Sequence, residues 1–358
     1  MISLYKAKDM KKEDILTRGI CFDPEIERTV DEILASVRTN GDQALYEYNR
    51  RFDHADLSSL EVSQEEMQKA YKAVASKFLE TLKLARKNIE DFHRRQVRSQ
   101  FVITDQPGVV LGQKITPIER VGLYVPGGTA AYPSTVLMNA VPAKLAGVQE
   151  VVMVTPPNED GSIKPEVLAA AQIAGISRVF KVGGAQAIAA LCYGTKTIPR
   201  VDKITGPGNI YVATAKRRVY GMVDIDMIAG PSEILVIADE TSKPAQVAAD
   251  LLSQAEHDRM ASAVLVTDSL KLAKEVQEEL KKQLMTLPRS EIARTSMENN
   301  GKIILTDSID EAVKISNQIA PEHLELSVQD PFRILGAVKN AGSIFLGTQV
   351  PEALGDYL

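Results

Sequence analysis

Val121-Gly122-Leu123-Tyr124-Val125, followed at once by Pro126-Gly127-Gly128-Thr129, sets the pattern for most of the chain. A short apolar run with β-branched residues that ends at a glycine turn is typical of a buried strand. A helical segment from Pro133 to Leu145 and a second apolar run, Val151 to Val154, follow it. Because parallel strands need a long crossover between them, this order predicts a parallel sheet with helical connections.

The same alternation continues to residue 232 and restarts after Ala229-Gly230-Pro231-Ser232-Glu233. We therefore expect an α/β protein with two units of mostly parallel sheet, about 122–232 and 233–350, preceded by helices. Among those helices, Asp23-Pro24 and Gly41 predict the two ends of one helix. The capping box Ser63-Gln64-Glu65-Glu66 predicts the start of a long helix that reaches about Arg95.

Composition narrows the class of protein. The 358 residues are 44% hydrophobic and 25% charged, which is ordinary for a globular protein of about two domains. The net charge of −5 gives no electrostatic footprint for nucleic acid. The two cysteines, Cys21 and Cys192, form no disulfide framework. With no apolar run of membrane-spanning length and no secretion signal at the start, we expect a cytoplasmic protein without membrane partners.

Three glycine turns follow strands of the first unit: Gly127-Gly128, Gly183-Gly184 and Gly206-Pro207-Gly208. In a parallel sheet all three fall at the carboxyl edge, where open α/β sheets bind ligands. The dinucleotide fingerprint GxGxxG is absent, so the spacing alone predicts a nucleotide or phosphate ligand of unknown class, or plain tight turns.

The polar stretch Leu251-Leu252-Ser253-Gln254-Ala255-Glu256-His257-Asp258 is predicted to end a helix. Gln254 and His257 are three residues apart and would point to one side of that helix. Carboxamide, imidazole and carboxylate groups are ligands that zinc accepts, and an imidazole beside a carboxylate suits proton transfer. A histidine at a helix end also simply caps the helix, and Gln254 there also serves as a hydrogen-bonding group, so the residues alone leave both interpretations open.

Seven stretches in this order resemble one family, histidinol dehydrogenase. The resemblance runs from the first predicted helix to the last residue. The stretches are Tyr124-Val125-Pro126-Gly127-Gly128-Thr129-Ala130, Val182-Gly183-Gly184-Ala185-Gln186-Ala187-Ile188-Ala189-Ala190-Leu191, Gly206-Pro207-Gly208-Asn209, Ala229-Gly230-Pro231-Ser232-Glu233, Leu251-Leu252-Ser253-Gln254-Ala255-Glu256-His257, Ala320-Pro321-Glu322-His323-Leu324 and Gly355-Asp356-Tyr357.

The resemblance implies a zinc-dependent homodimer with a shared active site and two incomplete Rossmann-like units. It implies oxidation of L-histidinol to L-histidine through histidinaldehyde by two NAD⁺ in succession, which ends histidine biosynthesis. On this basis we expect an N-terminal arm, 1–20. We expect a substrate and zinc domain made of 21–121 plus 233–358, and an NAD-binding domain, 122–232.

The resemblance also implies roles for single residues. Gln254, His257 and Asp356 are expected to bind zinc. The same three residues, with Ser232 and His323, are expected to contact the substrate. Tyr124, Gln186 and Asn209 are expected to contact NAD. Glu322 and His323 are expected to form the acid–base pair.

Members of the family continue beyond the residues that match Gly355-Asp356-Tyr357. The continuation carries a histidine that completes the zinc site of the partner subunit and a glutamate near the substrate. This sequence ends at Leu358, and neither His54 nor His93 has the right surroundings to replace that histidine. For a chain that ends here, we expect a site of three ligands, weak zinc binding and poor turnover.

Other functions remain as alternatives. A zinc-dependent hydrolase would use Glu322 to activate water without NAD. A dehydrogenase acting on another amino alcohol would use the same residues. Cys192 would be the nucleophile of a thiol-based aldehyde oxidation, although its apolar helical surroundings are typical of an inert cysteine. A two-lobed binding protein would have no proton for Glu322 and His323 to move.

Overall fold

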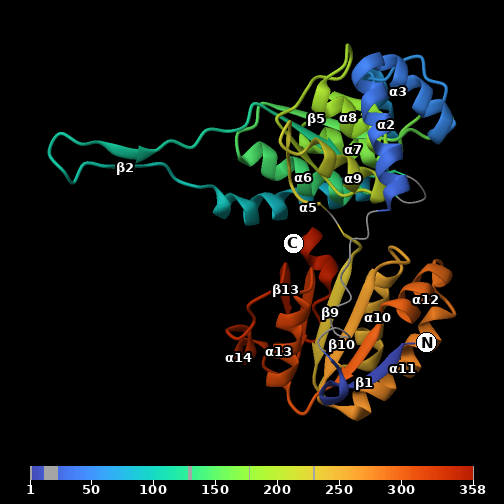
Figure 1. The fold of residues 1–358 in the computed structure, drawn as a ribbon, viewed down its shortest axis with the longest axis vertical. Coiled ribbons are helices and arrows are strands. Elements are labelled where there is room, and N and C mark those ends of the chain that lie inside the picture. The colour runs from blue at the N-terminus through green and yellow to red at the C-terminus, as the bar shows by residue number, and fades with distance from the viewer. Residues whose placement is uncertain (1, 12–22, 128–130, 177, 229, 358) are drawn as a thin grey trace. The chain divides into compact units, whose positions relative to one another are not determined.

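The structure, a computed structural model, describes residues 2–11, 23–127, 131–176, 178–228 and 230–357, and leaves the side chain of Asp356 undescribed. The chain forms two compact units (Figure 1). Unit 1 comprises Met1–Ile20 and Gly230–Gly355, and unit 2 comprises Cys21–Ala229 and Asp356–Leu358. Each unit contains a parallel sheet with helices, so the predicted α/β class is confirmed.

The sheet of unit 2 has five parallel strands in the order β6-β5-β4-β7-β8. The strands are β4 (Arg120–Tyr124), β5 (Glu150–Thr155), β6 (Arg178–Lys181), β7 (Lys203–Thr205) and β8 (Asp224–Ile225). Four helices connect them: α6 (Pro133–Leu145), α7 (Pro165–Ala174), α8 (Gly184–Tyr193) and α9 (Ile210–Val219). Strand order reverses at β4, the first strand, which places its carboxyl end at the position where such sheets bind ligands.

Both faces of this sheet are buried. Val152 and Val154 of β5 pack with α8 and α9, whereas Val151 and Met153 pack on the opposite face with α6 and α7. This alternation follows from the two-residue repeat of a strand, and burial on both faces explains the continuous apolar runs of the sequence.

The N-terminal helices complete unit 2. They are α2 (Pro24–Asn40), α3 (Asp42–Tyr48), the π-helical turn η2 (Asn49–Asp53), α4 (Gln64–Ala73), α5 (Ser76–His93) and η3 (Arg94–Gln96). The apolar faces of α2 and α5 belong to the same cores as the strands of residues 120–225. The expected grouping of residues 21–121 with 233–358 is therefore wrong, because an amphipathic helix does not reveal in its sequence which sheet it covers.

The helix expected from Ser63 to Arg95 is in fact two helices. Its capping box is confirmed, since Ser63 accepts from the N–H of Glu66 at 3.1 Å and Glu66 accepts from the N–H of Ser63 at 2.8 Å. Val74 and Ala75 between α4 and α5 have extended backbones. The break lets α4 pack on α7 while α5 packs mainly on α6, which one straight helix would not do.

The sheet of unit 1 has six parallel strands in the order β1-β11-β10-β9-β12-β13. They are β1 (Ser3–Lys6), β9 (Glu233–Ala238), β10 (Ser262–Thr267), β11 (Lys302–Leu305), β12 (His323–Ser327) and β13 (Ser343–Leu346). Part of the expected N-terminal arm is thus strand β1, followed by η1 (Ala7–Asp9), while residues 12–20 lie outside the described part of the chain.

Helices cover both faces of this second sheet as well. They are α10 (Pro244–Ala255), α11 (Leu270–Leu284), α12 (Ser290–Asn299), α13 (Ile309–Ile319) and α14 (Pro331–Leu335), and the short 3₁₀ helix η4 (Glu352–Asp356) follows β13. Ile234 and Val236 of β9 face α10 and α11, while Leu324 and Leu326 of β12 face α13. Because side chains alternate along a strand, His323 and Glu325 point to the α10 side.

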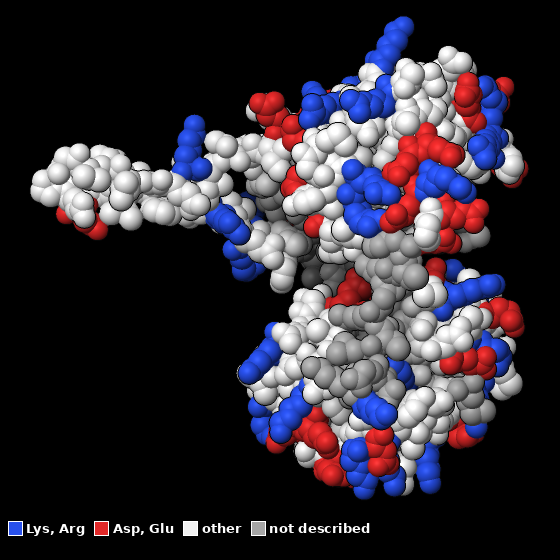
Figure 2. Space-filling view, viewed as in Figure 1, with Lys and Arg blue, Asp and Glu red and all other residues white. Residues whose placement is uncertain are grey.

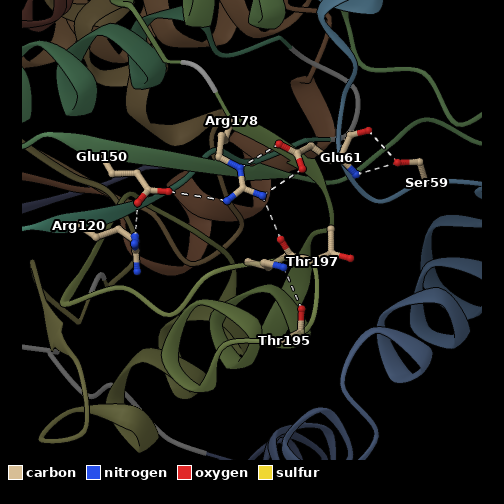
Figure 3. A network of polar contacts seen from close by, with 8 residues as sticks. Ser59, Glu61, Arg120, Glu150, Arg178, Thr195 and Thr197 are labelled. Atoms are coloured by element: carbon tan, nitrogen blue, oxygen red, sulfur yellow. Dashed lines mark hydrogen bonds and ion pairs between the residues drawn. The ribbon is translucent and has the colours of Figure 1, made fainter.

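A network of charged side chains lies at the amino edge of the unit 2 sheet, opposite the glycine turns (Figure 3). The Arg178 guanidinium donates to both oxygens of the Glu61 carboxylate, at 2.9 and 3.0 Å. Glu150 lies 3.7 Å from the same guanidinium and accepts from Nε of Arg120 at 2.5 Å. This network therefore ties the starts of β4, β5 and β6 to the segment that precedes α4.

Replacing Arg178 with alanine should lower the free energy of unfolding by about 1–2 kcal/mol, because a bidentate, partly buried pair is lost. Urea unfolding measures this change. Arg178→Lys keeps the positive charge but cannot donate to both carboxylate oxygens at once. Its free energy of unfolding should lie between those of the native chain and Arg178→Ala. The matched control is Arg50→Ala. Arg50 and Asp56 form an exposed ion pair with an N–O distance of 3.3 Å, and its loss should change the free energy of unfolding by less than about 0.5 kcal/mol.

Two further strands, β2 (Phe101–Ile103) and β3 (Leu111–Gln113), pair only with each other as an antiparallel hairpin. All six residues are exposed, Val102 at 70% and Leu111 at 60%. The hairpin carries few charges (Figure 2). A two-stranded ribbon with apolar side chains on both faces is marginally stable alone.

Among the described residues, no helix is long and apolar enough to cross a membrane.

Candidate active site

The predicted acid–base residues Glu322 and His323 lie at the amino end of β12, beside the start of β9. Ala320, a non-glycine residue with φ of 51°, ends α13 and turns the chain toward them. His323 Nδ1 lies 3.1 Å from the Glu233 carbonyl oxygen, and the Glu233 N–H donates to Glu322 Oε2 at 3.3 Å. One peptide segment of β9 therefore holds both side chains.

This contact defines the tautomer of His323. A carbonyl oxygen only accepts, so Nδ1 carries the proton and Nε2 of the neutral ring keeps its lone pair. The ring packs on Phe345 of β13, with centroids 6.3 Å apart and planes inclined by 27°. The Glu322 carboxylate is 3.8 Å from Nδ1 and half exposed. The arrangement provides an oriented imidazole base beside a carboxylate that water can reach.

Gln254 lies in the last turn of α10 and is buried, and its Nε2 donates to Glu352 Oε1 at 2.9 Å. His257 lies beyond the helix end, contrary to the expectation that both residues are helical. Its N–H donates to the Gln254 carbonyl at 3.1 Å, and its own carbonyl accepts from Arg289 at 3.2 Å. The two predicted ligands are thus adjacent on one tight turn.

The two remaining residues predicted to contact zinc or the substrate, Ser232 and Asp356, lie on separate segments. Ser232 directly precedes β9, and its carbonyl accepts from the N–H of Ser262 at 3.0 Å. Asp356 is the last residue of η4, and its carboxylate lies outside the description. Within the described residues, no three His, Cys, Asp or Glu side chains form a metal-binding group. Gln254 is not one of these residue types, and the side chain of Asp356 is not described. His257 is therefore the one predicted zinc ligand to which this finding applies.

Gln254 and His257 nevertheless suit a cation. The side-chain oxygen Oε1 of Gln254 receives no hydrogen bond from the described residues, while the side-chain nitrogen Nε2 is engaged. The His257 side chain is exposed, and none of its described contacts involves the imidazole. Both residues stand at the carboxyl end of α10, the negative end of the helix dipole, where positive charge is favoured.

In unit 2, Tyr124 and Gln186 meet at Gly184. The Tyr124 hydroxyl accepts from the Gly184 N–H at 3.1 Å, and burial raises the pKa of Tyr124 to about 12, so its O–H stays available as a donor. Gly184 has φ of 62°, and a Cβ there would lie 2.6 Å from Gln186 Oε1. Only glycine combines this backbone with that close approach.

The glycine turns also have a packing role. A Cβ at Gly127 or Gly183 would lie 2.3 or 2.5 Å from the ring of Pro156, which follows β5. A Cβ at Gly206 would lie 2.0 Å from the Tyr124 carbonyl oxygen. Close packing of the three turns therefore accounts for these glycines by itself. Gly128 of the first turn lies outside the described residues.

Asn209 is the N-cap of α9, and its Oδ1 accepts from the N–H groups of Tyr211 and Val212, each at 3.1 Å. The first turn of α9 is thus satisfied by the protein itself. By contrast, α8 starts at Gly184, its N-cap Gly183 makes no side-chain cap, and the Gly184 N–H donates to the neutral Tyr124 hydroxyl. The positive end of the α8 dipole at this turn favours an anion such as a phosphate.

Cys192 is buried in α8, and burial raises the pKa of its thiol. A thiol with a raised pKa is a poor nucleophile, which disfavours the thiol-based alternative. Cys21 lies outside the described residues.

Comparison with known proteins identifies the family. A model of the histidinol dehydrogenase family matches residues 17–358. The histidinol dehydrogenase of Clostridium acetobutylicum is 56% identical over 334 residues, which cover 93% of this chain and 78% of that protein. The crystal structure of histidinol dehydrogenase from Elizabethkingia anophelis has a TM-score of 0.95 at 38% identity and covers 99% of this chain and 82% of that chain. This chain belongs to the histidinol dehydrogenase family.

Membership in the histidinol dehydrogenase family confirms the resemblance seen in the seven stretches and the expectation of an oxidoreductase of histidine biosynthesis. The match to the Elizabethkingia histidinol dehydrogenase likewise confirms the α/β fold. The individual site residues stay predictions, as do zinc, NAD and the homodimer.

Three carboxyl groups near Gln254 in this histidinol dehydrogenase family member were not predicted from the sequence. Glu352 accepts from Gln254, and also from Ser253 Oγ at 3.0 Å, while its N–H donates to Glu325 Oε1 at 3.0 Å. Glu325 in turn shares a hydrogen bond with Asp250 of α10. Glu325 is an acidic residue between apolar residues of a parallel strand, and such a residue indicates a buried polar contact. This position in the sequence could have predicted the buried carboxyl group.

Proposed function

We propose that this protein oxidises L-histidinol to L-histidine through histidinaldehyde, using two NAD⁺ in succession, as the last step of histidine biosynthesis. Family membership supports the reaction. The observation that carries the proposal is the geometry of His323, whose Nδ1 is held by the Glu233 carbonyl and whose Nε2 is left as a base. Oxidation of an alcohol needs such a base for the hydroxyl proton and an acceptor such as NAD⁺ for the hydride. Hydrolysis of a substrate needs no hydride acceptor.

His323 acts in the first oxidation. The alcohol loses a hydride to NAD⁺ and its hydroxyl proton to Nε2 of His323, which gives the aldehyde and NADH. The fixed Nδ1–H contact keeps Nε2 in one orientation during this transfer.

Glu322 acts in the second oxidation. Water adds to the aldehyde carbonyl as the Glu322 carboxylate takes one of its protons, which gives the oxyanion of the hydrate. This anion then loses its hydride to the second NAD⁺ and becomes the carboxylic acid. Half exposure of Glu322 supports its access to water.

Gln254, His257 and Asp356 are the proposed zinc ligands, and Ser232, Gln254, His257, His323 and Asp356 are the proposed substrate contacts. The unengaged oxygen of Gln254 and the exposed imidazole of His257 support the described part of this set. A bound zinc ion would supply a positively charged template for the imidazole and amine of histidinol.

Tyr124, Gln186 and Asn209 are the proposed NAD contacts. The neutral Tyr124 hydroxyl and the N-terminus of α8, whose N-cap is the glycine Gly183, support binding of the phosphates and ribose at the carboxyl edge of the unit 2 sheet. Because the Oδ1 of Asn209 already caps α9, we propose that this residue contacts NAD through its amide nitrogen.

We further propose a cytoplasmic homodimer with a shared active site. The exposed apolar hairpin β2–β3, which has no cover among the described residues, supports a subunit contact. The low cysteine count supports a reducing compartment.

The direct test adds L-histidinol and NAD⁺ to the purified protein and follows the absorbance of NADH. Two NADH per histidine are expected, and a zinc chelator should abolish the reaction. Comparison with other amino alcohols under the same conditions tests the substrate. Absence of NADH with all of them, alongside hydrolysis of an ester or amide, would instead favour the zinc-dependent hydrolase.

A further inference from the structure

Glu352 connects three segments of unit 1. Its Oε1 accepts from Gln254 Nε2 at 2.9 Å and from Ser253 Oγ at 3.0 Å, both in the last turn of α10. Its backbone N–H donates to Glu325 Oε1 of β12 at 3.0 Å. Glu352 is also the first residue of η4, the helix that ends at Asp356.

The contact with Glu352 determines which way the Gln254 carboxamide faces. A carboxylate oxygen only accepts, so it pairs with the NH₂ end of the carboxamide and not with its oxygen. With Nε2 held in this way, the oxygen is left unengaged by the described residues. Oxygen is the end of a carboxamide that binds a metal ion, since the NH₂ group only donates.

We propose that Glu352 is a positioning residue for zinc, which orients the Gln254 carboxamide so that its oxygen faces the metal. This inference rests on the proposed zinc site and adds a residue that acts through a ligand rather than as one. Partners of this kind fix the orientation of metal ligands, and their loss typically lowers metal affinity by about 10–100-fold.

The test measures zinc affinity of the full chain by competition with a chromogenic chelator. Glu352→Ala should weaken zinc binding by about 10–100-fold. Glu352→Asp keeps the charge but shortens the reach, and should weaken binding by roughly tenfold. Glu352→Gln keeps an accepting oxygen at the same reach, and should stay within about threefold of the native chain. The matched control is Glu240→Ala, an exposed acidic residue just after β9, which should bind zinc like the native chain.

A double-mutant cycle separates positioning from a general structural effect. If Glu352 acts through Gln254, the variant with both Glu352→Ala and Gln254→Ala should bind zinc no more weakly than Gln254→Ala alone. The visible spectrum of the cobalt-substituted protein gives a second measurement, since a misplaced ligand changes the geometry around the metal. Glu352→Ala should change this spectrum, and Glu352→Gln should preserve it.

The outcomes distinguish the two levels of the proposal. A native chain that binds neither zinc nor cobalt would contradict the proposed metal site itself. Weak binding by Gln254→Ala together with native affinity in Glu352→Ala and Glu352→Asp would overturn the inference alone. Additive losses in the double variant would also overturn it, because they would show that Glu352 acts independently of Gln254.

Discussion

Replacing Glu322 with glutamine is expected to stop the protein at the aldehyde. Hydration of the aldehyde loses its general base, which should slow the second oxidation by about 10²–10⁴-fold, while oxidation of the alcohol stays within about threefold. Glutamine still offers an oxygen to the Glu233 N–H, which donates to Glu322 in the native chain, so the local fold is preserved. The expected stoichiometry changes from two NADH per histidinol to one.

Single-turnover reactions started from histidinol and from histidinaldehyde measure the two steps separately. His323→Asn is the complementary variant, because it removes the base of the first oxidation and leaves Glu322 in place. It should slow oxidation of the alcohol by a similar factor. Equal loss of both half-reactions in Glu322→Gln would reject the division of roles between these neighbouring residues.

The sequence predicted the strands and helices of each sheet well because the local pattern determines them. The proline at the start of α6 and the glycines after β6 and α7 are examples, since each acts within its own segment. The sequence could not reveal which helices cover which sheet. The apolar stripe of α2 would suit either unit, and only tertiary packing assigns it to unit 2.

The candidate site residues were predicted from the resemblance to the histidinol dehydrogenase family, and the structure adds how their side chains are held. Strand β12 was not predicted from the sequence, because His323-Leu324-Glu325-Leu326-Ser327 is not the apolar, β-branched run that indicated the other strands, yet it is the element that aligns His323 with Glu233. In unit 1 the proposed acid–base pair lies at the amino ends of β9 and β12, whereas open α/β sheets usually bind ligands at the carboxyl ends. General rules of the fold therefore would not have located this site.

Glu325→Gln is expected to flatten the pH dependence of stability in unit 1. Burial, together with the nearby negative charge of Asp250, raises the pKa of Glu325 from 4.5 to about 9. Burial also raises the pKa of Asp250, to about 6. Near neutral pH, Glu325 therefore keeps its proton and donates it to the Asp250 carboxylate.

The sign of the effect follows from proton linkage. Between pH 4.5 and 9 the folded protein binds a proton at Glu325 that the unfolded chain has released, so stability falls as the pH rises through this range. Each pH unit is worth at most about 1.4 kcal/mol, so the native chain should lose roughly 2–4 kcal/mol between pH 6 and 9. Above pH 6 little of this change comes from Asp250.

Glutamine at position 325 is neutral at every pH, accepts from the Glu352 N–H with its oxygen and donates to Asp250 with its amide. The variant should therefore match the native chain near pH 5 and exceed it in stability by roughly 2–4 kcal/mol at pH 9. Hydrogen exchange in peptides from β9 and β12 measures this opening free energy without interference from unit 2. Glu240→Gln, at an exposed carboxyl, should retain the native slope. A variant at position 325 with that same slope would mean that Glu325 is ionised in the folded protein.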